Sequence, residues 1–290
     1  MSATPLLTAR ECKLLQAARA AGVASVVCTL DLGRTTSTIA VSADEWTREG
    51  RSFPYPESCK PRTIYYWNGT EYEPASRYTT SLFKLVPTDW GPPTFEIDGI
   101  KMLPTAKLSP YADAERKVGL IAPRGKIVLD TCGGLGYFVA WCLRGGAARV
   151  LSFEKHAGVL WLRSLNPWSP DSPWQPRPGP ALQLTQGDIA QEIRTLPDRS
   201  VDAILHDPPR FAIAGELYSQ VFYDQLARVL RPGGALFHYT GAPNSKSRGR
   251  DLAREVIARL RHAGFATELN GDGVLARASS RSNVLGVNRP

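Results

Sequence analysis

The sequence predicts an α/β fold in which a Rossmann-like, seven-stranded sheet follows a small N-terminal α+β module. Short apolar segments recur from residue 127 onward, and each ends at or just before an acidic residue. A glycine-rich turn with Gly133, Gly134 and Gly136 follows the first segment, and helical stretches separate the others. Short buried strands that alternate with helices are typical of a parallel α/β sheet.

Four carboxylates mark the ends of the predicted strands, which we expect near 127–130, 150–154, 182–188 and 201–207: Asp130, Glu154, Asp188 and Asp207. The carboxyl ends of parallel strands line one crevice, where ligands bind. Right-handed crossovers therefore predict that the four acids share one rim. An acid about 20 residues beyond a glycine-rich turn can accept hydrogen bonds from a ribose diol, and Glu154 suits that role. Taken singly, each acid also fits a plain helix N-cap or turn.

The remaining elements complete the sheet. Arg231-Pro-Gly-Gly predicts a turn before a fifth strand at 234–239, and a helix is expected at 250–263. Strands at 266–269 and 273–278 predict an antiparallel edge hairpin. Prolines exclude a helix or a central strand from 166–180, so we expect a surface connection there, packed over the sheet edge by Trp168 and Trp174.

The segment before residue 110 predicts a separate α+β module. Thr8 and Glu11 form a capping-box pattern for a helix that Gly22 ends, and strands are expected at 23–32 and 35–41. Asn68-Gly69 and Asp98-Gly99 each predict a hairpin, the former with a type I′ turn. The aromatics that flank Asn68-Gly69 fit either a small core or a surface that stacks on RNA bases: Tyr65, Tyr66, Trp67 and Tyr72.

Composition limits the class of protein and its partners. The 290 residues carry a net charge of +8, which favours a polyanionic partner such as RNA, the alternative being a charge surplus that only keeps the protein soluble. Lys246, Arg248 and Arg250 form a glycine-punctuated basic loop suited to binding phosphates. The five cysteines form no CxxC pair, so we expect reduced thiols, no metal site and a cytoplasmic protein. No apolar run is long enough to span a membrane.

Several strings resemble the class I S-adenosylmethionine-dependent methyltransferases. They are Leu-Asp-Thr-Cys-Gly-Gly-Leu-Gly-Tyr at 129–137, His-Asp-Pro-Pro-Arg-Phe at 206–211, Gly-Glu-Leu-Tyr-Ser at 215–219 and Leu-Phe-His-Tyr-Thr-Gly at 236–241. More closely, they resemble a mostly archaeal, spermidine-synthase-like family whose members include dimethyltransferases of a cytidine in small-subunit ribosomal RNA. The segment 95–102 resembles that family too.

The resemblance implies S-adenosylmethionine as the cofactor and assigns residues 1–110 to an accessory module and 111–290 to the methyltransferase domain. The cofactor residues it implies are Asp130, Thr131, Cys132, Gly133, Gly134, Gly136, Tyr137, Glu154, Lys155, Asp188, Ile189 and Asp207. In similar amino-methyltransferases, the carboxylate of the Asp-Pro-Pro string and the carbonyl of the next residue accept the hydrogens of the acceptor amine. Those positions are Asp207 and Pro208 here, and Pro209 stiffens the backbone.

The chain departs from that pattern at the next position. Base amino-methyltransferases usually place an aromatic ring directly after Asp-Pro-Pro, whereas this chain has Arg210 and then Phe211. Arginine can stack on a base or bind a phosphate, so we expect methyl transfer to an amino group in structured RNA, with a ribosomal cytidine as the favoured acceptor. Alternatives are an aminopropyltransferase, a methyltransferase for a protein or small-molecule amine, and a non-enzymatic RNA-binding protein. The sequence predicts no oligomeric state.

Overall fold

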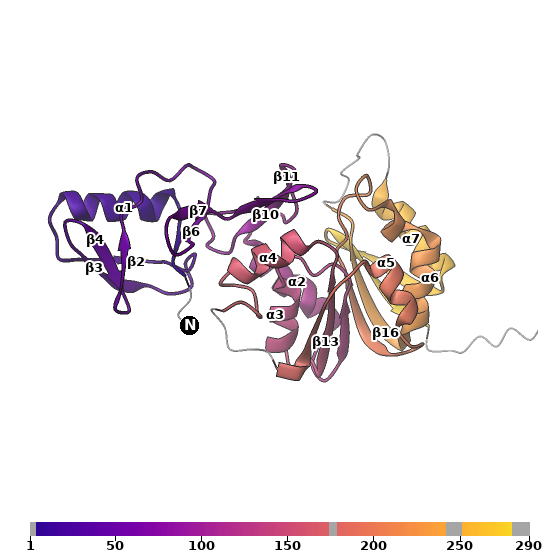
Figure 1. The fold of residues 1–290 in the computed structure, drawn as a ribbon. Helices are drawn as coiled ribbons and strands as arrows, with labels where there is room; N and C mark the ends of the chain where they lie inside the picture. The colour runs from indigo at the N-terminus through magenta and orange to yellow at the C-terminus, as the bar shows by residue number, and fades with distance from the viewer. Residues whose placement is uncertain (1–3, 174–178, 242–250, 280–290) are drawn as a thin grey trace, which may run out of the picture. The chain divides into compact units, whose positions relative to one another are not determined.

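The computed structural model describes residues 4–173, 179–241 and 251–279 (Figure 1). The chain divides into two compact units. The first comprises Met1–Ala114, Gly134–Tyr137 and Ala157–Arg177, and the second comprises Glu115–Gly133, Phe138–His156 and Pro178–Pro290. The division predicted near residue 110 stays a prediction, because the first unit also takes two later segments of the chain.

The second unit contains the predicted seven-stranded sheet, with strand order β14-β13-β12-β15-β16-β18-β17. Its strands are β12 (Ile127–Asp130), β13 (Arg149–Glu154), β14 (Leu182–Gln186), β15 (Val201–His206), β16 (Leu230–Tyr239), β17 (Phe265–Asn270) and β18 (Gly273–Ala278). The first five are parallel, while β18 pairs antiparallel with both β16 and β17. The sheet and its antiparallel edge hairpin are thus confirmed.

One boundary in this sheet differs from the prediction. The turn predicted at Arg231-Pro-Gly-Gly lies inside β16, which begins at Leu230 rather than at Gly234. Leu230 pairs with Val201, and a register shift then brings Ala235 opposite Ala203. The strand tolerates the proline and glycines because this irregularity takes them out of regular pairing.

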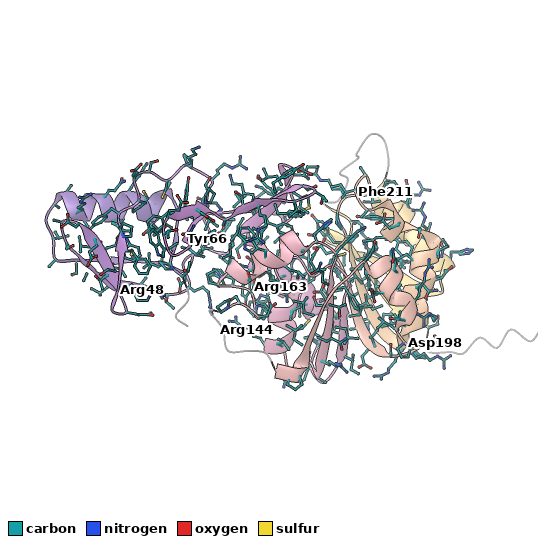
Figure 2. The ribbon with its side chains drawn as sticks, in the orientation of Figure 1. Arg48, Tyr66, Arg144, Arg163, Asp198 and Phe211 are labelled. Atoms are coloured by element: carbon teal, nitrogen blue, oxygen red, sulfur yellow. The ribbon has the colours of Figure 1, made fainter. Side chains whose placement is uncertain are left out.

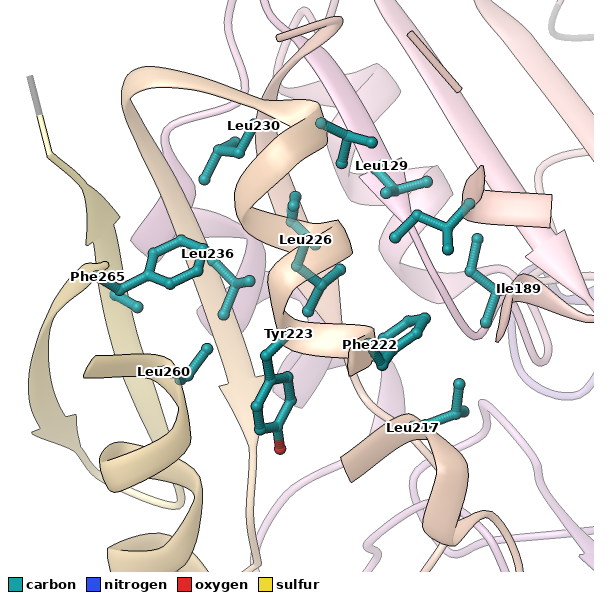
Figure 3. Close-up of a cluster of buried hydrophobic side chains, with 14 of the residues drawn as sticks. Leu129, Ile189, Leu217, Phe222, Tyr223, Leu226, Leu230, Leu236, Leu260 and Phe265 are labelled. Carbon is teal, nitrogen blue, oxygen red and sulfur yellow. The ribbon is translucent and has the colours of Figure 1, made fainter. Parts of the chain in front are cut away.

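Helices α6 (Gln220–Val229) and α7 (Leu252–His262) provide much of the core of the second unit. Ser219 caps α6 by accepting a hydrogen bond from the Phe222 amide. Apolar residues at helical spacing, including Tyr223 and Leu226, place one face of α6 in the core. Figure 3 shows these side chains between Leu260 and Leu129. Burial of each such leucine contributes about 2 kcal/mol.

The other helices are shorter or join the two units along the chain: α2 (Pro110–Ile121), α3 (Tyr137–Arg144), α4 (Ala157–Leu165), α5 (Ile189–Glu192), and the 3-10 turns η1 (Gly179–Ala181), η2 (Ile193–Thr195) and η3 (Gly215–Tyr218). No helix in the described ranges is both long and apolar enough to cross a membrane.

The first unit holds α1 (Ala9–Ala20) and three small antiparallel sheets. Thr8 and Glu11 form the predicted capping box of α1. The sheets have the orders β1-β6-β7, β2-β3-β4-β5 and β11-β10-β9-β8. Their strands are β1 (Leu6–Leu7), β2 (Ser25–Cys28), β3 (Ser37–Val41), β4 (Glu45–Arg48), β5 (Arg51–Pro54), β6 (Tyr65–Trp67), β7 (Tyr72–Pro74), β8 (Ser76–Tyr78), β9 (Leu82–Val86), β10 (Thr94–Ile97) and β11 (Ile100–Lys101).

The two predicted hairpins form with different turns. Asp98 and Gly99 have φ of 49° and 77° and join the paired residues Ile97 and Ile100, as the sequence predicts. The type I′ turn predicted at Asn68-Gly69 is wrong. Trp67 pairs with Tyr72 across a longer loop, because the Asn68 side chain accepts hydrogen bonds from the amides two and three residues ahead.

The aromatics of the Asn68 hairpin belong to a core. Tyr65 is buried with Leu7 and Trp46, and Trp67 and Tyr72 pack against the same cluster. The core interpretation is therefore confirmed for Tyr65, Trp67 and Tyr72. Tyr66 lies outside this cluster and is half-buried, with its ring 6.0 Å from that of Trp161.

Trp168 packs within the first unit, whereas the sequence predicted that it packs over the edge of the large sheet. Its indole nitrogen donates to the Leu32 carbonyl at 3.1 Å, and its ring lies 5.1 Å from that of Tyr111 in the first unit. Trp174 lies outside the described residues.

Candidate active site

The turn after β12 is fixed by both neighbouring strands of the second unit. Asp130, at the end of β12, is 1% exposed and accepts a hydrogen bond of 2.8 Å from the Ser152 hydroxyl of β13. The Thr131 amide donates to the Leu205 carbonyl of β15, and the Gly133 amide donates to the Phe153 carbonyl of β13. The start of the predicted cofactor turn is therefore anchored at the carboxyl edge of the sheet.

Cys132, in the predicted cofactor turn, is subject to the charges of three of the predicted acids. Burial raises the pKa of its thiol well above the usual value, and the charges of Glu154, Asp130 and Asp207 raise it further. The thiol is neutral at physiological pH and is a poor nucleophile. A neutral thiol among carboxylates makes a suitable environment for a cationic ligand.

Glu154 and Asp188 occupy the next strand ends. Glu154 is 8% exposed and accepts a 2.9 Å hydrogen bond from the His156 amide. Asp188 caps α5 by accepting from the Ala190 amide, so the plain N-cap interpretation holds for this acid. It also pairs with Lys155 at 2.8 Å, and this hydrogen bond raises the pKa of Lys155. Ile189 points its side chain into the core, which leaves only its backbone for a ligand.

Asp207 follows β15 and pairs with a lysine that the sequence analysis missed. Lys117 on α2 is 1% exposed, and its Nζ lies 3.3 Å from Asp207 Oδ2. The same ammonium lies 3.9 Å from the centroid of the Tyr239 ring, which is within cation–π range. The one signal was its place beside the apolar residues Val118 and Ile121, at positions where a solvated lysine is not expected.

The residues after Asp207 are held in place by contacts with Tyr218. The Tyr218 hydroxyl donates to the Pro209 carbonyl at 3.0 Å, and the Tyr218 ring lies 5.5 Å from that of Phe211. Phe211, which is labelled in Figure 2, is half-buried against the core, whereas Arg210 is exposed. Pro208 is buried. The string is thus a braced loop from which Arg210 extends into solvent.

Two buried histidines brace the strand ends beneath this loop. His206 lies 2.7 Å from the Thr131 hydroxyl through Nδ1, and its ring centroid lies 4.4 Å from that of His238. His238 Nε2 is 3.0 Å from the Tyr223 hydroxyl. Burial lowers the pKa of His238 to about 4, and burial together with His238 lowers the pKa of His206. Both rings are therefore neutral, and they support the strand ends through uncharged hydrogen bonds.

Three predicted cofactor residues belong to the first unit. Gly134 and Gly136 have φ of 48° and 78°. A Cβ on Gly136 would lie 2.6 Å from the Arg163 guanidinium carbon, so only glycine fits there. Arg163, labelled in Figure 2, pairs with Asp171 at 2.7 Å. The buried Tyr137 hydroxyl donates to the Pro93 carbonyl, which gives that side chain a structural role.

The predicted RNA-binding residues Lys246, Arg248 and Arg250 lie outside the described residues. Among the residues that the structure does describe, no cluster of three or more His, Cys, Asp or Glu side chains has the arrangement of a metal site.

Comparison with known proteins agrees with the geometry. The S-adenosyl-L-methionine-dependent methyltransferase family matches residues 175–266. A spermidine synthase solved with the transition-state analogue AdoDATO superposes with a TM-score of 0.56 at 16% identity, over 71% of this chain and 73% of that one. Spermidine synthase from Thermotoga maritima gives 0.54 at 17%, over 71% and 72%. At this identity the two structures show a shared fold alone.

The chain is a class I S-adenosylmethionine-dependent methyltransferase, and S-adenosylmethionine is its cofactor. It belongs to the same family as the uncharacterized protein MJ1233 of Methanocaldococcus jannaschii, with which it is 42% identical over 203 residues, 70% of this chain and 68% of that protein.

The residues of the second unit fit this cofactor. The charges of Asp130, Glu154 and Asp207 act on the Cys132 thiol, which burial keeps neutral and therefore unreactive towards a sulfonium. Glu154 ends the strand next to β12, where an acid hydrogen-bonds ribose hydroxyls in nucleotide-binding sheets. We expect Glu154 to hold the ribose, and the negative charges of Asp130 and Glu154 that act on the Cys132 thiol to favour the cationic sulfur.

Proposed function

We propose that this protein transfers a methyl group from S-adenosylmethionine to an exocyclic amino group in structured RNA, with a cytidine of ribosomal RNA as the favoured acceptor. Asp207 is the residue that receives the amine. The five cysteines are free thiols in the structure, which suits the reducing cytoplasm as the place of reaction.

The ion pair between Lys117 and Asp207 is the observation that carries the proposal. A buried lysine already compensates the charge of this carboxylate. An ammonium substrate that approached Asp207 would therefore meet the like charge of Lys117, and repulsion is strong where water is scarce. A neutral amine, such as the exocyclic amine of a base, meets no such repulsion. The pair thus supports a neutral acceptor.

Methyl transfer to a base amino group requires the protein to activate a weak nucleophile. The lone pair of a base amino group is delocalised into the ring, and S-adenosylmethionine supplies the electrophilic methyl group when bound. Asp207 accepts a hydrogen bond from the amine and localises the lone pair on nitrogen. The nitrogen gains the methyl group and loses a proton, which the carboxylate accepts. Lys117 holds the carboxylate in place, and Tyr218 fixes the loop through the Pro209 carbonyl.

Charge and exposure support RNA as the carrier of that amine. The net charge of +8 favours a polyanion. Arg210 is exposed directly after Asp-Pro-Pro, where a guanidinium can stack on a base or bind a phosphate. Phe211 is half-buried and packs on Tyr218, so we assign it to the support of the loop rather than to base stacking.

Aminopropyl transfer is the second candidate, because the fold is shared with spermidine synthases. Its polyamine acceptors are cationic and need uncompensated carboxylates. Lys117 opposes that requirement at Asp207. We therefore rank aminopropyl transfer, and methyl transfer to a protein or small cationic amine, below methyl transfer to RNA.

An assay of acceptors against the Asp207→Asn variant tests the proposal. We expect the wild-type protein to label ribosomal RNA from methyl-labelled S-adenosylmethionine and to leave putrescine unreacted with the decarboxylated cofactor. Asp207→Asn should slow methyl transfer roughly 100-fold or more. Calorimetry should show that the variant still binds the cofactor, and thermal unfolding should show that it is folded. Near-normal turnover of a folded variant would refute the assigned role.

A further inference from the structure

The sheet formed by β8–β11 in the first unit has one face covered by α4 and an opposite, exposed face, on which only the end with Val86 and Thr94 is buried. Phe83 of β9 points to the covered side, where it is 1% exposed and meets Gly158 of α4. Arg77, directly opposite Phe83, stacks on the Trp161 ring of the same helix at 4.2 Å. The residues that alternate with these point the other way. The exposed face takes no part in the proposed methyl transfer.

Basic and aromatic side chains lie together on the exposed face. Lys84 pairs across the strands with Glu96, and Glu96 pairs with Lys101, so the three share this side of the sheet. Next to Lys84 on the same face, Tyr78 is 74% exposed and Leu82, its cross-strand partner, is 42% exposed. We call this set, with Trp90 beside it, the β8–β11 face.

Trp90 lies close to Lys101 of the β8–β11 face, because both side chains contact Thr105. It is 50% exposed, and its indole nitrogen donates to the Thr105 carbonyl at 3.2 Å. Lys101 Nζ donates to the hydroxyl of the same Thr105 at 3.0 Å. Thr105 therefore brings an exposed indole and an exposed ammonium to one place, with Tyr78 and Lys84 on the same sheet.

The charge of the β8–β11 face is positive, because its cations outnumber its acids: Lys84, Lys101 and Arg62 against Glu96 and Asp98. Glu96 pairs with Arg62 at 2.7 Å, and Asp98 at the hairpin turn accepts from the Leu82 amide at 2.8 Å. Within the described part of the chain, neither Lys84 nor Lys101 forms an ion pair. Two ammonium groups are thus left to bind a ligand that carries negative charge.

We propose that the β8–β11 face binds a single-stranded segment of RNA. Bases stack on exposed aromatic rings whatever their sequence, and cations along the same surface neutralise the phosphates. Tyr78 and Trp90 supply the rings, and Lys84 and Lys101 supply the charges. This inference rests on RNA as the substrate of the proposed function, and it assigns the first unit the task of holding RNA outside the reacting residues.

Fluorescence anisotropy with a labelled single-stranded RNA of about ten nucleotides tests the inference. Lys84→Glu/Lys101→Glu should weaken binding at least tenfold and lower the logarithmic salt slope by about 1.4, because each phosphate that is no longer neutralised removes about 0.7. Tyr78→Ser should weaken binding roughly tenfold through loss of stacking. Arg10→Glu/Lys13→Glu is the matched control. It replaces two exposed cations of α1 and changes the net charge by the same amount as Lys84→Glu/Lys101→Glu.

The outcomes separate this inference from the proposed function. Loss of binding in the β8–β11 variants but not in the control supports it, provided that calorimetry shows unchanged cofactor affinity. Equal losses in both double variants, or unchanged binding in Tyr78→Ser and Lys84→Glu/Lys101→Glu, would overturn it, and unchanged binding would leave the face to a protein partner. A wild-type protein that binds no RNA would overturn the RNA substrate of the proposed function as well.

Discussion

Two lysine–carboxylate pairs lie at the carboxyl edge of the large sheet and differ mainly in burial. Lys117 and Asp207 are separated by 3.3 Å, and their side chains are 1% and 17% exposed. Lys155 and Asp188 are closer, at 2.8 Å, but their side chains are 54% and 22% exposed. The shorter distance does not identify the more consequential pair, because the strength of a charge interaction depends on the water around it.

This difference in burial gives the two ion pairs different roles at the carboxyl edge of the sheet. Lys155 is largely solvated, and Asp188 already has a task as the cap of α5. Lys117 is enclosed between Asp207 and the Tyr239 ring, so neither charge of that pair can be removed without leaving the other poorly solvated. We infer that the buried pair sets the properties of the acceptor end, whereas the exposed pair adjusts the local surface.

The largest expected effect comes from breaking the buried pair. Lys117→Met keeps the length of the side chain but leaves the Asp207 carboxylate without its ammonium partner. Because removal of one partner from a buried pair strands the other charge, we expect a loss of about 3 kcal/mol in the free energy of unfolding. Urea denaturation measures this loss, and methyl transfer should fall at least tenfold in parallel.

Lys117→Met/Asp207→Leu is the control for that substitution. It removes both charges, so stability should return to within about 1 kcal/mol of the wild type while activity stays lost. A Lys117→Met protein as stable as the wild type would show that water reaches the pair, and the contrast with Lys155 would then disappear.

The structural basis of this contrast was only half visible in the sequence. Asp207 was predicted because it sits in an Asp-Pro-Pro string at the end of an apolar strand. Lys117 was not, because its partner is 90 residues away along the chain and a helical lysine is normally solvated. A local pattern reports a strand and its end, whereas a buried ion pair depends on which helix packs against that end.

The two units also differ in how much of their structure the sequence predicted. The large sheet was predicted nearly whole, because apolar segments bounded by glycine and acids report burial directly. The hairpins β4–β5 and β8–β9 were missed. Their strands have three to five residues, and neither turn carries the Asn-Gly or Asp-Gly signal that revealed β10–β11. The β8–β9 hairpin is held by packing against α4, and Trp46 and Phe53 of β4–β5 share a buried cluster with Leu15 of α1. No local pattern shows these contacts.

A second prediction concerns His206 and His238, which, like Lys117, are ionisable side chains buried from water. Burial lowers the pKa of His238 to about 4, against about 6.5 in the unfolded chain. The stability that this neutral ring contributes is therefore complete above pH 6.5 and is lost as the pH falls towards 4. Between pH 6.5 and 5 we expect a loss of about 2 kcal/mol from this residue.

Urea denaturation from pH 7.5 to 5 measures that loss. The pKa of His206 is lowered as well, so the wild-type slope should exceed that of one histidine. His238→Gln keeps an amide for the Tyr223 hydroxyl and removes one titrating ring, so it should make the slope shallower. A slope identical in the wild type and the variant would mean that protonation of His238 is not linked to unfolding.

The smallest effect is expected from the exposed pair. Lys155→Ala removes an ammonium that water already solvates, so we expect less than about 1 kcal/mol of lost stability. Asp188 keeps its cap on α5, because the Ala190 amide still donates to it. Salt should reduce the difference between variant and wild type, since exposed pairs are screened. Denaturation at low and high salt measures this. A salt-independent loss near that of Lys117→Met would mean that hydrogen-bond distance, and not burial, ranks the two pairs.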